Sequence, residues 1–396
     1  MPTTITFFPV DNGDMTLVKF GDVSGTTLLI DVNIRQDADD PDNDDCRDVA
    51  KDLRARLKKD SNGRPYVDAF LLSHPDQDHC RGLERHFYLG ALADYPDDDE
   101  DYADKRIVIR ELWSSPIVFR RASKNHTLCD DAKVFNKEAR RRVAANRKNN
   151  FNVEDGDRIK VLGKDVDGKT DDLTPICHEV NSVFSTIRGG ASAFFSARLL
   201  GPFEPQDDED KEELMAKNQS SVIINFTLAA DTSTPKGANF LTGGDAEVYI
   251  WREQWARHKH EQHVFEYDLL QAPHHCSWHT LSEDSWSDKR REVKVDGDAR
   301  KALSQANPGA FIVASSKPIV DDANDPPCIL AKEEYVDILS SKSGTFYCTG
   351  EYPKKSSVEP LEFTVGQWGL TPPAKKDGGA KAAGIIGAAK APMPHG

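Results

Sequence analysis

The sequence predicts an α/β fold in which one large domain spans residues 1–368, and three observations support this prediction. Short apolar runs alternate along the chain with segments whose apolar residues recur at helical spacing. Several of the apolar runs end directly in His or Asp. With 396 residues, the chain is long enough to bury a large core. We expect an irregular insertion at about 90–160 and a disordered tail at 369–396, where the composition is rich in Ala, Gly, Pro and Lys.

The first part of the chain predicts a β-meander followed by a helix and a strand. The turn sequences DNGD and GDVSG separate three apolar runs. Val49, Leu53 and Leu57 recur at helical spacing and predict a helix over 46–59. A further helix is expected to begin near Gly82. The strands are predicted at 5–10, 15–20, 26–32 and 67–72.

Strands and helices continue to alternate through the rest of the domain. Residues 164–192 are the one long stretch without a clear pattern. Helices are predicted over 132–148, 247–263 and 331–341. Strands are predicted at 106–113, 157–163, 196–202, 220–229, 268–273, 309–316 and 345–350, with a further apolar strand at the start of the segment 239–247.

Charge and cysteine content bear on compartment and partners. A net charge of −15 disfavours general adhesion to nucleic acid. Seven cysteines without a CxxC pair, behind an N-terminus that lacks a signal-peptide pattern, favour reduced thiols in the cytosol. The sequence contains no run of eighteen apolar residues, so no membrane span is expected. We therefore expect a cytoplasmic protein without membrane contact.

The charge is unevenly distributed, which leaves two kinds of partner open. Residues 120–148 contain ten Lys or Arg and three Asp or Glu. This basic segment is either an ordinary solvated helix or a surface that binds the phosphates of a polyanion. On the second interpretation, Arg140, Arg141 and Arg142 are candidate contacts for nucleic acid. The acidic stretches at 36–45 and 207–213 would repel a duplex and would suit a basic protein partner.

The loop SHPDQDH at 73–79 is the first of three strand ends that carry metal-binding side chains. It follows the apolar run AFLL and offers His74, Asp76, Asp78 and His79. In an extended or tightly turning loop, this spacing lets several side chains converge on one point. Imidazole and carboxylate together suit Zn, Mn or Fe.

Two later strand ends offer further ligands. Asp245 follows an apolar strand in LTGGDAE, where Gly243 and Gly244 permit a tight turn. His274 and His275 follow the strand LLQAP. Each motif alone is typical of a polar turn or an ordinary surface, but their joint occurrence at strand ends predicts a metal site at the edge of a sheet.

At these residues the sequence resembles the metallo-β-lactamase fold. The motif His-x-His-x-Asp-His of that fold is matched at 74–79, with Asp76 in place of the second His. One branch of this fold contains the hydrolase domain of the competence DNA-uptake channel proteins. The motifs of that branch are similar to this variant, to GGDAE and to the loop APHHCSWHT. The similarity covers most of 5–350, and its other segments are VDNGDMTLV, TTLLIDV, NQSSVIINF and SGTFYCTG.

The resemblance implies a four-layered αββα sandwich and a site for two divalent cations, Zn or Mn. It implies that His74 and Asp76 hold the first cation, that Asp78 and His79 hold the second, and that Asp245 bridges both. His274 would complete the second site while His275 contacts the scissile group, or the two histidines would exchange these roles.

The first of the two sites is expected to be weak, because no histidine matches the middle ligand of the fold. An Asn-x-x-Ser stretch of the branch is matched by Asn218 and Ser221, which are expected to line the site. Asp31 is expected to support the ligands rather than to bind a cation.

The function that the resemblance implies is hydrolysis of a phosphodiester, foremost in nucleic acid, by a metal-activated hydroxide. Asp78 and His275 are the expected catalytic residues. Two alternatives remain open at this point. One is a hydrolase of a small ester, lactone or cyclic nucleotide, and the other is a partner-binding protein of the same fold with weak or lost catalysis.

Three other motifs have competing interpretations. His258, His260 and His263 form HKHEQH, but on a helix they do not share one face. The acidic run at 37–45 lacks the glycine and the final glutamate of an EF-hand loop. Cys80 and Cys276 flank the expected ligands, and we interpret them as small core residues rather than thiolate ligands.

Overall fold

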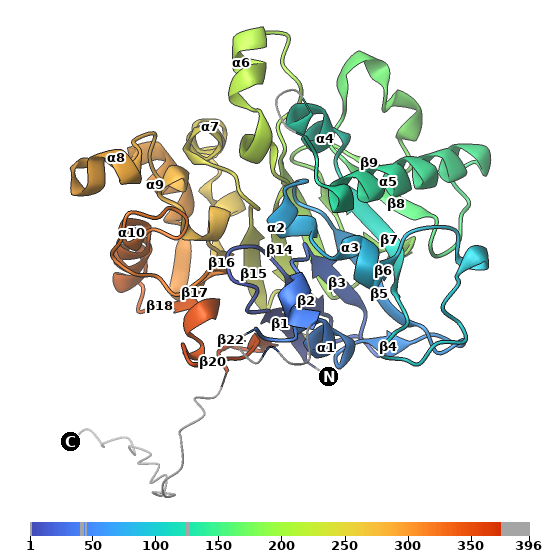
Figure 1. The fold of residues 1–396 in the computed structure, drawn as a ribbon. Helices are drawn as coiled ribbons and strands as arrows, with labels where there is room; N and C mark the ends of the chain where they lie inside the picture. Colours follow the sequence, from blue (N-terminus) through green and yellow to red (C-terminus); the bar gives the residue numbers. More distant parts are fainter. Residues whose placement is uncertain (1, 40–42, 44–45, 124–126, 374–396) are drawn as a thin grey trace, which may run out of the picture.

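The computed structural model describes residues 2–39, 43, 46–123 and 127–373, which form an α/β protein with two mixed β-sheets (Figure 1). The larger sheet has 11 strands within these residues, in the order β22-β21-β1-β2-β3-β5-β7-β8-β9, with β4 and β6 paired to its middle strands. Its strands are β1 (Thr3–Phe7), β2 (Thr16–Lys19), β3 (Thr27–Ile30), β4 (Lys58–Lys59), β5 (Pro65–Leu71), β6 (Phe87–Tyr88), β7 (Ile107–Ser114), β8 (Arg158–Leu162), β9 (Cys177–His178), β21 (Leu361–Gly366) and β22 (Gly369–Thr371).

The smaller sheet has the order β10-β13-β14-β15-β16-β17-β18. Two short ribbons, β11 with β12 and β19 with β20, lie apart from both sheets. The strands are β10 (Val183–Phe184), β13 (Phe195–Gly201), β14 (Ile223–Leu228), β15 (Ala238–Thr242), β16 (Tyr267–Gln271), β17 (Ala306–Ala314) and β18 (Thr345–Cys348), and the ribbons are β11 (Thr186–Ile187), β12 (Gly190–Ala191), β19 (Pro353–Lys354) and β20 (Ser357–Val358).

The α-helices lie mainly in two groups. In Figure 1, α4 and α5 lie beside β7 and β8, whereas α7, α9 and α10 lie beside β16–β18. Within the described residues, no helix is long and apolar enough to cross a membrane. The helices are α1 (Val49–Arg54), α2 (Gln77–Cys80), α3 (Leu83–His86), α4 (Pro116–Ala122), α5 (Asp130–Lys148), α6 (Glu209–Leu214), α7 (Val248–His258), α8 (Trp286–Lys289), α9 (Gly297–Leu303) and α10 (Ile329–Ser340).

Both sheets repeat one pattern of pairing, and this pattern positions the site. Three antiparallel strands, β1-β2-β3 or β13-β14-β15, are followed by parallel strands, β5 or β16 and its neighbours. Parallel strands run in the same direction, so their carboxyl ends lie at one edge of the sheet. Asp31 and His74 follow β3 and β5 in the larger sheet, while Asp245 and His274 follow β15 and β16 in the smaller sheet.

Side chains of both sheets share the main hydrophobic core. Phe7 of β1 packs edge to face against Phe240 of β15, with ring centroids 6.0 Å apart, and Phe20 stacks on Phe195 of β13 at 4.9 Å. A second core contains residues of β15–β18 and of the helices that cover them, including the buried Trp251. The two cores hold the strand ends of both sheets in fixed positions.

The predicted strands are present, and three segments differ from the sequence prediction. Residues 107–162 form β7, α4, α5 and β8, so they complete the larger sheet instead of an irregular insertion. The helix predicted at 46–59 is shorter, because β4 follows α1, whereas the helix expected near Gly82 begins at Leu83 with Gly82 as its N-cap. Of the predicted tail, 369–371 pair with β21, and 374–396 lie outside the described residues.

Candidate metal centre

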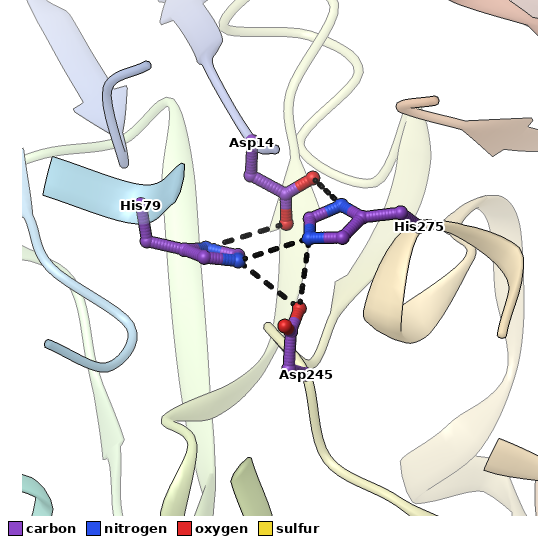
Figure 2. Close-up of side chains that lie close together, drawn as sticks. All are labelled: Asp14, His79, Asp245 and His275. Atoms are coloured by element: carbon purple, nitrogen blue, oxygen red, sulfur yellow. Dashed lines mark hydrogen bonds and ion pairs between the residues drawn. The ribbon is translucent and has the colours of Figure 1, made fainter. Parts of the chain in front are cut away.

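Four buried side chains from distant parts of the chain converge on one point (Figure 2). Asp14, His79, Asp245 and His275 each offer one ligand atom, and the four atoms lie within 4.8 Å of one another. In the described part of the chain, this tetrad is the one group of three or more His, Cys, Asp or Glu side chains whose ligand atoms all lie this close together, and it could hold a metal ion.

Glycine at position 13 brings Asp14 to the cluster. Gly13 has φ +145°, and a Cβ there would lie 2.1 Å from Asn33 Nδ2 and 2.7 Å from the carbonyl oxygen of Asp78. Only glycine therefore lets the β1–β2 turn approach α2 this closely. The amide of Asp14 donates to the carbonyl of Asp78 at 3.2 Å, which ties the turn to the segment that carries Asp78 and His79.

Tight turns also position the ligands of the smaller sheet. Gly244 has φ +49°, and a Cβ there would lie 2.9 Å from Ser73 Oγ. The amide of Asp245 donates to Ser221 Oγ, and the amide of His274 donates to the Gly244 carbonyl. His274 and His275 have φ values of 51° and 54°, a left-handed conformation that side-chain-bearing residues adopt at a cost and that clusters at functional sites.

The donor atoms around one oxygen of Asp245 are spaced as ligands of a tetrahedral cation would be. Metal–ligand bonds of about 2.0–2.1 Å place tetrahedral donors roughly 3.3–3.4 Å apart. His79 Nε2 lies 3.2 Å from His275 Nε2 and 3.1 Å from Asp245 Oδ1. His275 Nε2 lies 3.4 Å from Asp245 Oδ1 and 3.4 Å from Asp78 Oδ2. The residues present therefore fit a divalent cation.

The other oxygen of Asp245 faces a second pair of imidazoles. Its Oδ2 lies 3.5 Å from His74 Nε2 and 3.7 Å from His274 Nε2. His74 Nε2 is buried, and it has no hydrogen-bond partner within the described residues. Asp76 precedes α2, and in the described contacts its carboxylate does not reach this group. The second group is therefore smaller, with two imidazoles and one shared carboxylate oxygen.

Carboxylates outside the donor set orient two of the imidazoles. His79 Nδ1 donates to Asp31 Oδ2 at 2.8 Å, and Asp31 also accepts from the amide and the hydroxyl of Ser73. With its proton on Nδ1, His79 turns the lone pair of Nε2 towards Asp245. Asp14 lies 3.4 Å from His275 Nδ1 and 3.8 Å from His79 Nδ1, on the far side of both rings (Figure 2). Its geometry is thus better suited to orienting the rings than to binding the same cation.

Replacing Asp31 by asparagine is expected to lower metal affinity about 10–100-fold, because the side chain can no longer fix the His79 tautomer as a carboxylate does. Asparagine tolerates the left-handed φ of 54° at this position, so the backbone should be preserved. Competition with a metal-binding dye measures the affinity, and an unchanged value would show that Asp31 does not orient the ligand.

Asn218 and Ser221 support the second group rather than contact its donors directly. Ser221 Oγ holds the amide of Asp245 and donates to the carbonyl of Asn218. Asn218 Nδ2 donates to Glu247 Oε1 at 3.1 Å, and that carboxylate oxygen lies 3.6 Å from His274 Nδ1. Glu247 thus lies beside Nδ1 of His274, at a longer distance than the hydrogen bond that joins Asp31 to His79.

The electrostatics of the cluster favour bound protons when no cation is present. Burial disfavours a charge on His79 and His275, but the carboxylates around each ring, Asp245 foremost, together outweigh this effect and hold each pKa well above its usual value. Burial likewise disfavours a charge on Asp245, yet the surrounding imidazoles hold its pKa well below the usual value. A divalent cation would replace imidazolium protons and leave the same carboxylate neutralised.

Metal binding is therefore expected to release protons and to change the pH dependence of stability. The raised imidazole pKa values stabilise the metal-free fold fully below about pH 6.5, and this contribution is lost as pH rises through the folded-state values. Metal-free protein should lose stability on the alkaline side, whereas metal-loaded protein should not. Calorimetric titrations with Zn²⁺ at pH 7, in buffers of different ionisation enthalpy, count the released protons, and a count of zero would contradict this account.

The structure pairs the two adjacent histidines differently from the first assignment made on resemblance. His275 lies with His79 and Asp78, and His274 lies with His74. Sequence reasoning did not select Asp14 or Glu247. A signal for Asp14 was present, since it follows Gly13 in a turn directly before a strand.

Arg141 and Arg142 are occupied by contacts within the protein. Arg142 is 1% exposed, and its guanidinium binds Glu138 and the carbonyls of Arg158 and Ile109. Arg141 binds Glu138 and Asp157. Arg140 is exposed, so among the three arginines it is the one that α5 presents to solvent.

The cysteines beside the ligands point to other partners. Cys80 Sγ lies 3.5 Å from Cys129 Sγ, and Cys276 is fully buried with its thiol near the carbonyl of Cys328. The hydrogen bond from Cys80 lowers the pKa of Cys129 to about 7, although burial opposes this effect. Neither thiol that flanks the expected ligands belongs to the cluster.

Cys129 is expected to react with iodoacetamide at a rate that rises through about pH 7. An ordinary thiol, with a pKa of about 8.5, shows the same rise about 1.5 pH units higher. Cys80, the partner of Cys129, should react slowly, because it is buried and its pKa is raised. Mass spectrometry of alkylated peptides across pH measures both rates. Titration of Cys129 near pH 8.5 would contradict the expected hydrogen bond from Cys80.

The remaining motifs do not form sites in the described residues. His258 packs edge to face on Phe265, and the metal-binding cluster includes none of the histidines of HKHEQH. Asp39 of the acidic run pairs with Arg85 and His86, while 40–42 and 44–45 lie outside the described residues. Searches against known protein families and against curated proteins found no match for this chain.

Proposed function

We propose that the protein is a metal-dependent hydrolase of phosphodiesters, with a dinuclear centre in a four-layered αββα sandwich of the metallo-β-lactamase type. The observation that carries the proposal is the spacing of donors around Asp245, which faces two imidazoles with each of its oxygens. A carboxylate shared in this way is what two adjacent cations require. The core shared by the facing sheets, with helices beside both, supports the proposed sandwich.

The chain offers two unequal sets of ligands for Zn²⁺ or Mn²⁺. The larger set has three residues beside the shared carboxylate and the smaller has two, which supports the expectation that one site is weak. The larger set is His79, His275, Asp78 and Asp245, and the smaller set is His74, His274 and Asp245. Bound divalent cations would lower the pKa of a water and neutralise charge on a phosphoryl oxygen.

The protein's own side chains orient the ligands and handle protons. Asp31 accepts a hydrogen bond from His79 Nδ1, and Asp14 lies 3.4 Å from His275 Nδ1, so that the Nε2 atoms face inwards. The Asp78 side chain is 34% exposed, far more than its neighbour His275 at 1%. Its carboxylate is therefore where the chain can accept a proton from an attacking water while remaining in reach of substrate.

A direct test is hydrolysis of bis-p-nitrophenyl phosphate and of single- and double-stranded DNA and RNA by Mn²⁺- or Zn²⁺-loaded protein. We expect cleavage that depends on the metal and is lost on chelation. Cleavage of the small diester alone would favour a small phosphodiester over a polynucleotide. Metal binding without hydrolysis of any of these substrates would overturn the proposal and favour a partner-binding role for the same fold.

A further inference from the structure

A polar pocket opens beside the donor set, on the side of Asp78. It has a volume of about 360 Å³, and Asp78, which lines its wall, also lies 3.4 Å from His275 Nε2. The other donors of the larger set are almost fully buried, so this pocket is the side from which the cluster meets solvent. The pocket is lined by Asp11, Asn12, Arg35, Gln77, Asp78, Arg81 and Lys317.

The charges in the pocket do not cancel once the cluster holds a cation. Arg35 is paired with Asp11 at 2.5 Å, and Asp78 belongs to the donor set. Arg81 and Lys317 have no carboxylate partner within the described residues, and the Nε of Arg81 is buried without a hydrogen-bond acceptor. These two positively charged side chains lie beside the proposed metal centre although the chain has a net charge of −15.

Hydrogen bonds fix the backbone of both Arg81 and Lys317. The amide of Arg81 donates to the Gln77 carbonyl, and its own carbonyl accepts from Ile34. The amide of Lys317 donates to Asn12 Oδ1 at 3.1 Å, just beyond the carboxyl end of β17. The backbone from which both side chains extend is thus fixed beside the pocket.

We propose that this pocket binds a second phosphate of the substrate, next to the phosphodiester that is hydrolysed, through Arg81 and Lys317. Guanidinium and ammonium groups are the usual protein ligands of phosphate oxygens. A volume of about 360 Å³ exceeds what one phosphate fills, so an attached sugar fits as well. The inference rests on the proposed function and narrows its substrates to molecules with at least two neighbouring phosphates, such as an oligonucleotide.

The test compares dithymidylate that carries a 5′-phosphate with the same molecule after removal of that phosphate. Mn²⁺-loaded protein should hydrolyse the phosphorylated form with a kcat/KM at least about tenfold higher. Arg81→Gln and Lys317→Ala should each remove most of this preference, with little effect on bis-p-nitrophenyl phosphate. Lys259→Ala, which changes an exposed lysine outside the pocket, should keep the preference.

A binding measurement separates failure of this inference from failure of the proposed function. Fluorescence anisotropy of 3′-labelled dithymidylate, with a non-hydrolysable methylphosphonate in place of the internucleotide phosphate, reports binding to Mn²⁺-loaded protein without turnover. Tighter binding of the phosphorylated form, lost in Lys317→Ala, would support the pocket even if the loaded protein hydrolysed nothing. Equal binding of both forms, with hydrolysis that ignores the 5′-phosphate, would overturn the pocket and leave the hydrolase standing. Since Lys317 is exposed, its substitution tests the inference even if Arg81→Gln fails to fold.

Discussion

Replacing Asp245 by asparagine is expected to abolish hydrolysis and most metal binding. Its two carboxylate oxygens face four imidazoles, so an amide removes the negative charge that both proposed cations share. Loss of a carboxylate that only orients a ligand already costs about 10–100-fold in affinity or activity, so loss of the shared ligand should cost more than about 100-fold. Metal analysis after dialysis and the rate on bis-p-nitrophenyl phosphate measure the two effects.

Asp99→Asn serves as the matched control, because Asp99 is exposed in a loop and does not belong to the cluster. This variant should retain wild-type metal content and activity. A circular dichroism spectrum like that of the wild type would show that Asp245→Asn folds. A folded Asp245→Asn protein with full metal content would mean that the cations are held elsewhere.

Replacing Arg142 by alanine is expected to destabilise the fold by about 2–5 kcal/mol, because it removes a fully buried side chain and one of the two guanidinium partners of the buried Glu138. Arg142 and Glu138 are 1% and 3% exposed, and the change also leaves two carbonyls without their donor. The neighbouring Arg140→Ala, at an exposed position, should change stability by no more than about 0.5 kcal/mol.

Urea denaturation of the two variants measures this difference in the free energy of unfolding. Similar values for Arg140→Ala and Arg142→Ala would show that Arg142 is not a structural residue. If Arg142 is structural, loss of nucleic-acid binding in its variant cannot be assigned to a phosphate contact. Arg140 is then the residue of this basic helix at which a contact with nucleic acid can be tested.

The parts of the site that are close in sequence could be predicted from the sequence. The loop 73–79 carries its ligands within one short stretch, and Asp245 and His274 directly follow apolar strands, so local pattern was enough to select them. Asp14 depends on a backbone contact between Gly13 and Asp78, which periodicity does not reveal. The pairing of His275 with His79 follows from two left-handed residues in one turn, and residue type alone does not indicate that conformation.

The fold shows the same division between local and long-range information. Individual strands were evident because apolar runs end at turn residues, but the sequence did not show that β7 pairs with β5 and that β8 pairs with β7, which brings residues 107–162 into the larger sheet. Parallel pairing joins strands that are far apart in the chain, so its partners are not visible in a local pattern. The burial of Arg142 is hidden from local pattern for a related reason, since its guanidinium binds carbonyls of β7 and β8.

The most direct test of the central claim is the metal content of the purified protein after equilibration with Zn²⁺ or Mn²⁺ and removal of loosely bound ions. We expect about two ions per chain, of which one is lost more readily, and near-complete loss of both in Asp245→Asn. Absence of tightly bound metal from folded wild-type protein, with each of these cations, would contradict the proposed dinuclear centre.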